Sequence, residues 1–159
     1  MRPMDDSVRM SPDTLLVSGG RPPRAPGAPV SPGVELTSTF VLPGDFVPGV
    51  PVYGRDSNAT WQAFESVVGA LEGAPEGATA FASGMAAGQA IFSLMPRGTR
   101  LVMGSTTYNA MLQSARDKAD AGHLDLVLVD VSDTDAVRGV LPGADSLLLD
   151  SPTNPLLQV

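Results

Sequence analysis

The sequence predicts an α/β fold with a mainly parallel sheet flanked by helices, preceded by an extended arm rich in proline and glycine. Two observations predict this fold. From residue 58 onward, short apolar stretches alternate with segments whose apolar residues recur at helical spacing, as in strands joined by crossover helices. Before it, the run GGRPPRAPGAPVSPG excludes long helices and central strands, because proline lacks a donor and glycine favours turns. We therefore expect an N-terminal arm over residues 1–57 and the first part of an α/β domain over residues 58–159.

The arm carries a candidate helical turn at residues 13–17 and several apolar side chains. A disordered tail is the alternative, since proline and glycine are abundant here. The apolar side chains favour an attached arm, and the expected anchors are Leu15, Leu16, Val34, Leu36, Phe40 and Phe46.

The first element of the α/β domain is a helix with Asn58 as N-cap and Gly73 as its stop. Its apolar face holds Trp61, Phe64, Val67, Val68 and Leu71. The later elements alternate between strand and helix: a strand at 78–82, a helix at 84–95, a strand at 100–104, a helix at 108–121, a strand at 124–131, a helix at 132–141 capped by Ser132, and a strand at 146–150.

Composition excludes several classes of function. The net charge is −7 without a cluster of basic residues, which disfavours nucleic acid and anionic membranes as partners. The absence of cysteine excludes disulfides, thiolate nucleophiles and cysteine-based metal sites. The N-terminus lacks the apolar core of a signal peptide and no stretch is long enough for a membrane helix, so a cytoplasmic location is expected.

Three loops should meet at the carboxyl edge of a parallel sheet, where such folds bind ligands: residues 83–85, 104–108 and 150–155. A helix that begins at Ser83-Gly84-Met85 points unpaired N–H groups outward, and its dipole favours an anion there. Tight helix–sheet packing through Gly84 and Gly88 is the alternative explanation of the same small residues, and this motif alone favours it.

The other candidate residues also have two interpretations each. The Tyr108 ring could stack on a flat ligand ring, or it could pack against the protein with its hydroxyl in solvent. Asn154 could bind a ligand through its side-chain donor and acceptor, or it could simply form a turn before Pro155. Tyr53 and Arg55 suit phosphate binding, or form a solvated surface pair. A magnesium site at Asp130 and Asp150 is disfavoured because no phosphate-binding loop accompanies them, and His123 and Lys118 match no catalytic pattern.

Together these pieces resemble the Cys/Met-metabolism family of pyridoxal-phosphate (PLP) enzymes, the cystathionine gamma-synthase and gamma-lyase group of fold type I. YGRDSNAT resembles the family motif Y-S-R-x-G-N-P-T, and SGMAA at 83–87 matches its S-G-M-A-A stretch. DSPTNP resembles E-[ST]-P-x-N-P, with Asp150 in place of glutamate. Tyr108 and the opening TLLVSGGRPP agree with the same family, so the resemblance covers nearly the whole chain in order.

The resemblance implies a role for each site residue. Gly84 and Met85 would hold the phosphate of PLP with their backbone N–H groups, Tyr108 would stack on the pyridine ring, and Asn154 would bind its phenolic oxygen. Tyr53 and Arg55 would reach the phosphate of a neighbouring subunit, which implies a homo-oligomer with shared sites, expected to be a homotetramer. Tyr108 and Tyr53 are also the candidate catalytic residues, and no metal is expected.

The fold implied is the large domain of the aspartate-aminotransferase type, incomplete here. The family's Schiff-base lysine and substrate-binding arginine lie beyond residue 159, so we expect an N-terminal fragment, inactive alone, of an enzyme for elimination or replacement on sulfur amino acids such as cystathionine, homocysteine or activated homoserine. Asn109 and Ala59 replace a glycine and a proline of the family pattern, which leaves the substrate open. The alternative is a non-catalytic α/β ligand-binding or scaffold domain.

Overall fold

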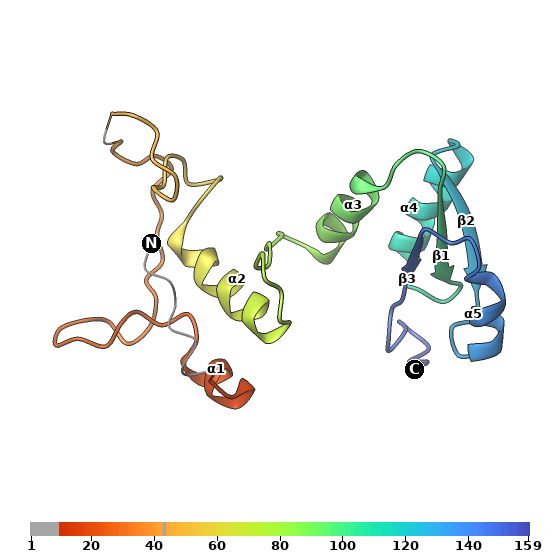
Figure 1. The fold of residues 1–159 in the computed structure, drawn as a ribbon, viewed down its shortest axis with the longest axis horizontal. Coiled ribbons are helices and arrows are strands. Elements are labelled where there is room, and N and C mark those ends of the chain that lie inside the picture. The colour runs from red at the N-terminus through yellow and green to blue at the C-terminus, as the bar shows by residue number, and fades with distance from the viewer. Residues whose placement is uncertain (1–9, 43) are drawn as a thin grey trace. The chain divides into compact units, whose positions relative to one another are not determined.

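The computed structural model describes residues 10–42 and 44–159, which form two compact units divided between Ala80 and Phe81 (Figure 1). The helix that begins after Asn58 belongs to the first of these units. The boundary between the arm (residues 1–57) and the α/β domain (residues 58–159) stays a prediction.

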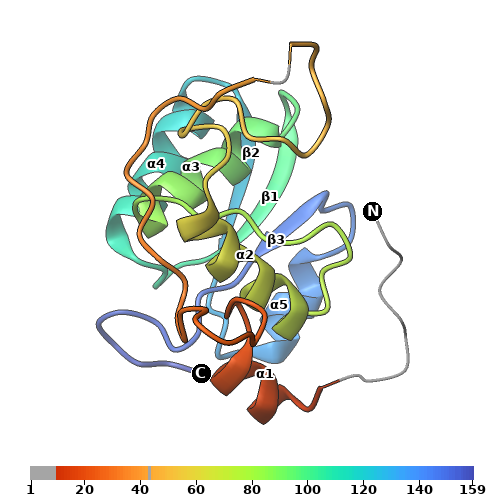
Figure 2. The ribbon, with the colours of Figure 1, turned by 90° about the vertical axis from the view of Figure 1, so that its left-hand side faces the viewer.

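The first unit contains helices α1 (Pro12–Ser18) and α2 (Ala59–Leu71). The turn predicted at residues 13–17 is therefore a full helix of seven residues, capped by the Ser11 side chain, which accepts from the Thr14 N–H. The end of α1 packs closely on the middle of α2 (Figure 2), and a Cβ added at Gly19 would lie 2.8 Å from a methyl group of Val67. The small residue at position 19 thus permits this contact.

Most of the chain between these helices is extended or turned, as predicted for the arm. Thr39 and Tyr53 form an isolated antiparallel bridge, and the Gly54 N–H donates to the Ser38 carbonyl at 2.8 Å. A Cβ at Gly54 would lie 2.5 Å from the Thr37 carbonyl oxygen, so only glycine allows this approach of two backbones.

Asn58 joins the arm to α2, because its side-chain amide donates to the Glu35 carbonyl and its oxygen accepts from the Thr60 N–H at 2.8 Å. It is the N-cap, as predicted, and Gly73 follows the helix end with a positive φ of 63°. On the predicted apolar face, Trp61, Val67 and Val68 are half-buried, whereas Phe64 is 61% exposed.

Four of the six expected anchors of the arm are wrong for this chain. Leu16, Val34, Leu36 and Phe46 are between 64% and 90% exposed, whereas Leu15 and Phe40 are half-buried. The physical reason is that a segment of loops offers no continuous face against which these side chains can pack.

The second unit contains α3 (Gly84–Leu94), β1 (Thr99–Gly104), α4 (Asn109–Asp120), β2 (Leu124–Val129), α5 (Thr134–Val140) and β3 (Ser146–Leu148). The strands form a parallel sheet in the order β2-β1-β3, with Leu101 opposite Leu126 and Val102 opposite Leu147. Helix α4 lies on one side of β2 and α5 on the other (Figures 1 and 2). The predicted mainly parallel α/β sheet flanked by helices is confirmed.

Two local predictions are wrong. Residues 78–82 form no strand. The Ala80 N–H instead donates to the Glu65 side chain at 2.7 Å, and a strand forms only where another strand accepts its hydrogen bonds. The cap of α5 is Asp133 rather than Ser132, since Asp133 accepts from two N–H groups of the first turn at 2.9 and 3.0 Å. Ser132 donates both its N–H and its hydroxyl to Asp130.

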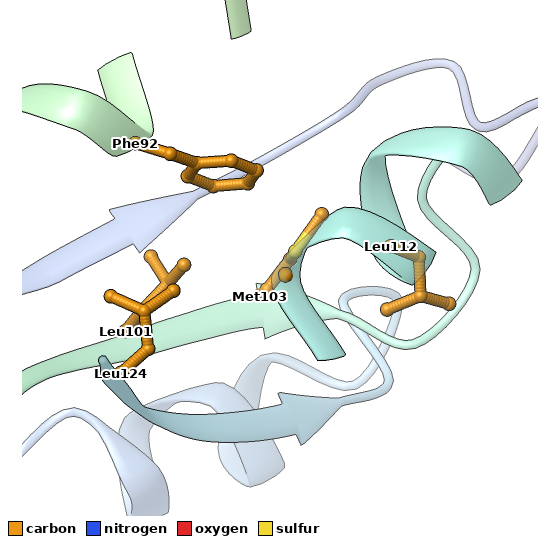
Figure 3. Close-up of a cluster of buried hydrophobic side chains, with 6 residues drawn as sticks. Phe92, Leu101, Met103, Leu112 and Leu124 are labelled. Atoms are coloured by element: carbon orange, nitrogen blue, oxygen red, sulfur yellow. The ribbon is translucent and has the colours of Figure 1, made fainter. Parts of the chain in front are cut away.

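The core lies between the sheet and the helices α3 and α4. Figure 3 shows the Phe92 ring of α3 facing Leu101 and Met103 of β1, with Leu112 of α4 beyond Met103. Leu101 and Met103 are fully buried. This packing fixes both helices on the sheet. Among the described residues, no helix has both the length and the apolarity needed to cross a membrane.

Candidate functional site

The candidate site lies at the carboxyl edge of the sheet. The three parallel strands end at Gly104, Val129 and Leu148, so the loops that follow them emerge at one edge. These loops comprise residues 105–108, 130–133 and 149–155. Tyr108 and Asn154 belong to two of them.

The start of α3 lies on the same side of the unit. Gly88 packs on Met111, the Gln89 amide donates to the Ser114 hydroxyl, and the Lys118 ammonium lies 5.9 Å from the Phe92 ring centroid. These contacts advance along both helices in the same direction, so α3 and α4 run parallel and begin at the same end. Because α4 begins at the carboxyl end of β1, Gly84 and Met85 are on the side of Tyr108.

The first turn of α3 is open around Gly84. Ser83 caps the helix by accepting from the Ala86 N–H at 3.1 Å, which leaves the N–H groups of Gly84 and Met85 without an intrahelical acceptor. Gly84 is exposed, and among the described atoms none lies within 4 Å of an added Cβ. Close packing therefore does not explain this glycine in the described structure.

Gly88 behaves differently. A Cβ at Gly88 would collide with the Met111 side chain, so this glycine permits close packing of α3 on α4. The sequence suggested an approach of α3 to the sheet; at Gly88 itself the near contact is with α4, whereas Phe92 of α3 packs on the sheet. The contact with Met111 therefore accounts for Gly88, whereas Gly84 has no such contact among the described residues.

Tyr108 is the N-cap residue of α4, and its side chain is 47% exposed. Its backbone N–H donates to the Asp150 carboxylate at 3.0 Å, and the Thr106 hydroxyl donates to the Gln158 side-chain oxygen at 2.8 Å. Two hydrogen bonds therefore hold the segment after β3, from Asp150 to Gln158, against the loop after β1. Sequence reasoning missed Thr106 and Gln158, which follow no local pattern.

Asn154 is exposed on the loop that follows β3. Its neighbour Thr153 is 1% exposed and organises this loop, because its hydroxyl accepts from the Gln158 N–H at 2.9 Å and its carbonyl accepts from the Leu157 N–H at 2.8 Å. The Asn154 amide is thus presented to solvent by a loop with its own hydrogen bonds.

Tyr53 and Arg55 belong to the first unit, where the structure brings them together. The Arg55 guanidinium lies 4.4 Å from the centroid of the Tyr53 ring, a cation–π distance, and Arg55 is exposed. Gly84, Met85, Tyr108 and Asn154 all belong to the second unit.

The acids near the sheet edge have local partners. Hydrogen bonds from the Ser132 hydroxyl and then from the Ser132 N–H lower the pKa of Asp130 below its usual value. Asp150 accepts from Tyr108, and within residues 10–42 and 44–159 no three acids or histidines come together as metal ligands. His123 is exposed.

The sequence profile of the family described as "Cys/Met metabolism PLP-dependent enzyme" matches residues 13–159. The chain belongs to this family. A Streptomyces coelicolor protein that carries the name cystathionine gamma-lyase is 37% identical over 150 residues, which cover 92% of this chain and 38% of that protein.

Solved structures agree with this membership of the Cys/Met-metabolism family. CalE6, a cystathionine gamma-lyase of Micromonospora echinospora, is 31% identical with a TM-score of 0.79, over 94% of this chain and 39% of that one. The cystathionine gamma-lyase of Lactobacillus plantarum, complexed with L-serine, is 29% identical with a TM-score of 0.81, over 94% of this chain and 39% of that one. The cystathionine gamma-synthase of Xanthomonas oryzae has a TM-score of 0.84 at 24% identity, over 96% of this chain and 40% of that one, and supports the fold alone. The chain therefore spans about two fifths of the length of these proteins.

The residues present fit part of a PLP site. PLP carries a phosphate and a flat aromatic ring. The open first turn of α3 supplies N–H donors suited to the phosphate, and the half-exposed Tyr108 supplies a ring on the same side of the unit. The family match favours an enzyme over a non-catalytic scaffold domain.

Proposed function

We propose that the full-length product containing this chain is a PLP-dependent enzyme for elimination or replacement on sulfur amino acids, of the cystathionine gamma-synthase or gamma-lyase type. The observation that carries the proposal is the open N-terminal turn of α3, on the side of Tyr108, in a chain matched by this family over residues 13–159. The L-serine complex of the Lactobacillus plantarum relative supports an amino-acid substrate.

In the proposed site, the N–H groups of Gly84 and Met85 hold the phosphate of PLP, and Tyr108 stacks on its ring. Asn154 donates a hydrogen bond to the phenolic oxygen of PLP and so orients the ring. When bound, PLP supplies an electron sink for the negative charge that develops on the substrate. The described residues thus serve to bind and orient the cofactor.

Tyr53 and Arg55 are proposed to bind the phosphate of a neighbouring subunit. The exposure of Arg55 supports this role, because its guanidinium is free to make charge-assisted hydrogen bonds outside its own unit. The protein is then a homo-oligomer with shared sites, proposed to be a homotetramer in the cytoplasm, without nucleic acid or membrane as partners. Tyr108 and Tyr53 are the proposed catalytic residues.

The reaction is tested on the full-length product with PLP and L-cystathionine. We expect release of ammonia if the enzyme performs elimination, or synthesis of cystathionine from cysteine and an activated homoserine if it performs replacement. Mass spectrometry of the products distinguishes the two. Neither reaction, with no PLP bound, would support a scaffold domain instead.

The site itself is tested by comparing Tyr108→Ala with Met85→Ala in the same full-length product. Tyr108→Ala should weaken PLP binding, because ring stacking contributes about 0.5–1.5 kcal/mol beyond the buried area. Met85→Ala keeps the backbone N–H and should bind PLP nearly as the parent does. Fluorescence titration with PLP measures both, and equal affinity of Tyr108→Ala and the parent would show that the stacking role is wrong.

A further inference from the structure

Asp150 makes a long-range hydrogen bond that no spacing in the sequence predicts. Its carboxylate accepts the backbone N–H of Tyr108 at 3.0 Å, across 42 residues of chain. Asp150 follows β3 and is half-buried, whereas Tyr108 follows the loop after β1. This bond therefore connects the ends of two neighbouring strands at the edge that carries the candidate site.

This bond is made to the backbone of Tyr108, from which the aromatic ring extends. Tyr108 begins α4 as its N-cap, and its side chain makes no capping hydrogen bond and is 47% exposed. The backbone of Tyr108 sets the direction in which its Cα–Cβ bond leaves the chain, and the Asp150 carboxylate holds that backbone by its N–H. The negative charge also lies at the start of α4, where the helix dipole favours it.

A second bond supports the same geometry. The Thr106 hydroxyl donates to Gln158 at 2.8 Å, and Gln158 in turn pairs with Thr153 through its own backbone. The loop that carries Asp150 is thus held at two points on the loop that carries Tyr108. Because this segment is held at two points, the Asp150 carboxylate has a fixed position and can hold the Tyr108 backbone in one orientation.

We propose that Asp150 is a positioning residue, which orients the Tyr108 ring for stacking on the cofactor by holding the Tyr108 N–H. The inference rests on the proposed function, since Tyr108 has a cofactor ring to meet only if the protein binds PLP. Asp150 acts through Tyr108.

The test uses the full-length product loaded with PLP and three variants. Asp150→Leu removes the acceptor while it keeps the same branched arrangement of heavy atoms, and Asp150→Asn keeps an acceptor oxygen without the charge. Asp145→Leu is the matched control, because the Asp145 carboxylate accepts the Arg100 N–H at 2.8 Å and so joins the same two strands at their opposite ends. PLP affinity by fluorescence titration, the circular dichroism of bound PLP in the visible region, and the melting temperature are measured for each.

We expect Asp150→Leu to weaken PLP binding by about two- to tenfold, the range of a lost aromatic stacking interaction, and to reduce the circular dichroism of the bound cofactor. Asp150→Asn should restore both signals nearly to the parent. Asp145→Leu should change only the melting temperature. In a Tyr108→Ala background, Asp150→Leu should cause no further loss of affinity, because its effect passes through the ring.

Parental affinity and parental circular dichroism in Asp150→Leu would overturn the inference while leaving the proposed function standing. Equal losses of PLP affinity in Asp145→Leu and Asp150→Leu would also overturn it, since the bond would then be structural only. If Asp150→Leu does not fold, Asp150→Ala removes the same acceptor without apolar bulk, and the same outcomes apply. A parent that binds no PLP contradicts the proposed function, and the role of Asp150 is then wrong as well.

Discussion

Leu101→Ala should lower the free energy of unfolding of the full-length product by about 2–5 kcal/mol, as large-to-small changes in well-packed cores do. Leu101 is fully buried on β1, the central strand, and contributes to the cluster with Phe92 and Leu124. Helix and sheet both contact this side chain, so the cavity cannot close without moving one of them. Denaturant unfolding followed by circular dichroism measures the loss.

Leu101→Met is the matched control, since it keeps the volume and apolar character of the side chain. It should cost less than about 1.5 kcal/mol. If Leu101→Ala and Leu101→Met unfold at the same denaturant concentration, the cluster around Leu101 is not the core of this unit. A large loss in the alanine variant alone supports the packing of Leu101 with Phe92 and Leu124.

Much of this fold could be predicted because its signals are local. The N-cap Asn58 directly precedes α2, and the apolar run at residues 124–129 is itself β2. Both predictions are confirmed. The strand expected at residues 78–82 had a suitable pattern as well. It fails because strand formation depends on a pairing partner elsewhere in the chain, which the pattern does not contain.

In the candidate site, too, local features could be predicted from the sequence and long-range contacts could not. Gly84 and Tyr108 were identified from their places after expected strands and before helices, and the structure puts both on one side of the second unit. The hydrogen bonds from Tyr108 to Asp150 and from Thr106 to Gln158 span 42 and 52 residues. Contacts across such separations depend on strand order, and no spacing in the sequence indicates them.

Arg55→Ala should weaken PLP binding by the full-length product by about ten- to a hundredfold. A hydrogen bond between charged groups contributes on the order of 1.5–3 kcal/mol, and the proposed role of Arg55 is such a bond to the phosphate in a neighbouring subunit. The melting temperature without PLP should change little, because Arg55 is exposed and contacts mainly the Tyr53 ring. Fluorescence titration with PLP measures the affinity, and size-exclusion chromatography monitors the oligomer.

Two variants separate the phosphate contact from simpler effects of charge. Arg24→Ala removes another exposed arginine of the same unit and should leave PLP affinity unchanged. Arg55→Lys keeps the positive charge but loses the forked donors, so its affinity should lie between those of the parent and Arg55→Ala. Equal affinities of the parent and Arg55→Ala would contradict the shared site, because a guanidinium that binds the phosphate of a neighbouring subunit cannot be removed without weakening PLP binding. If Arg24→Ala weakens binding as much as Arg55→Ala, the effect comes from the overall charge of the arm and Arg55 has no specific role.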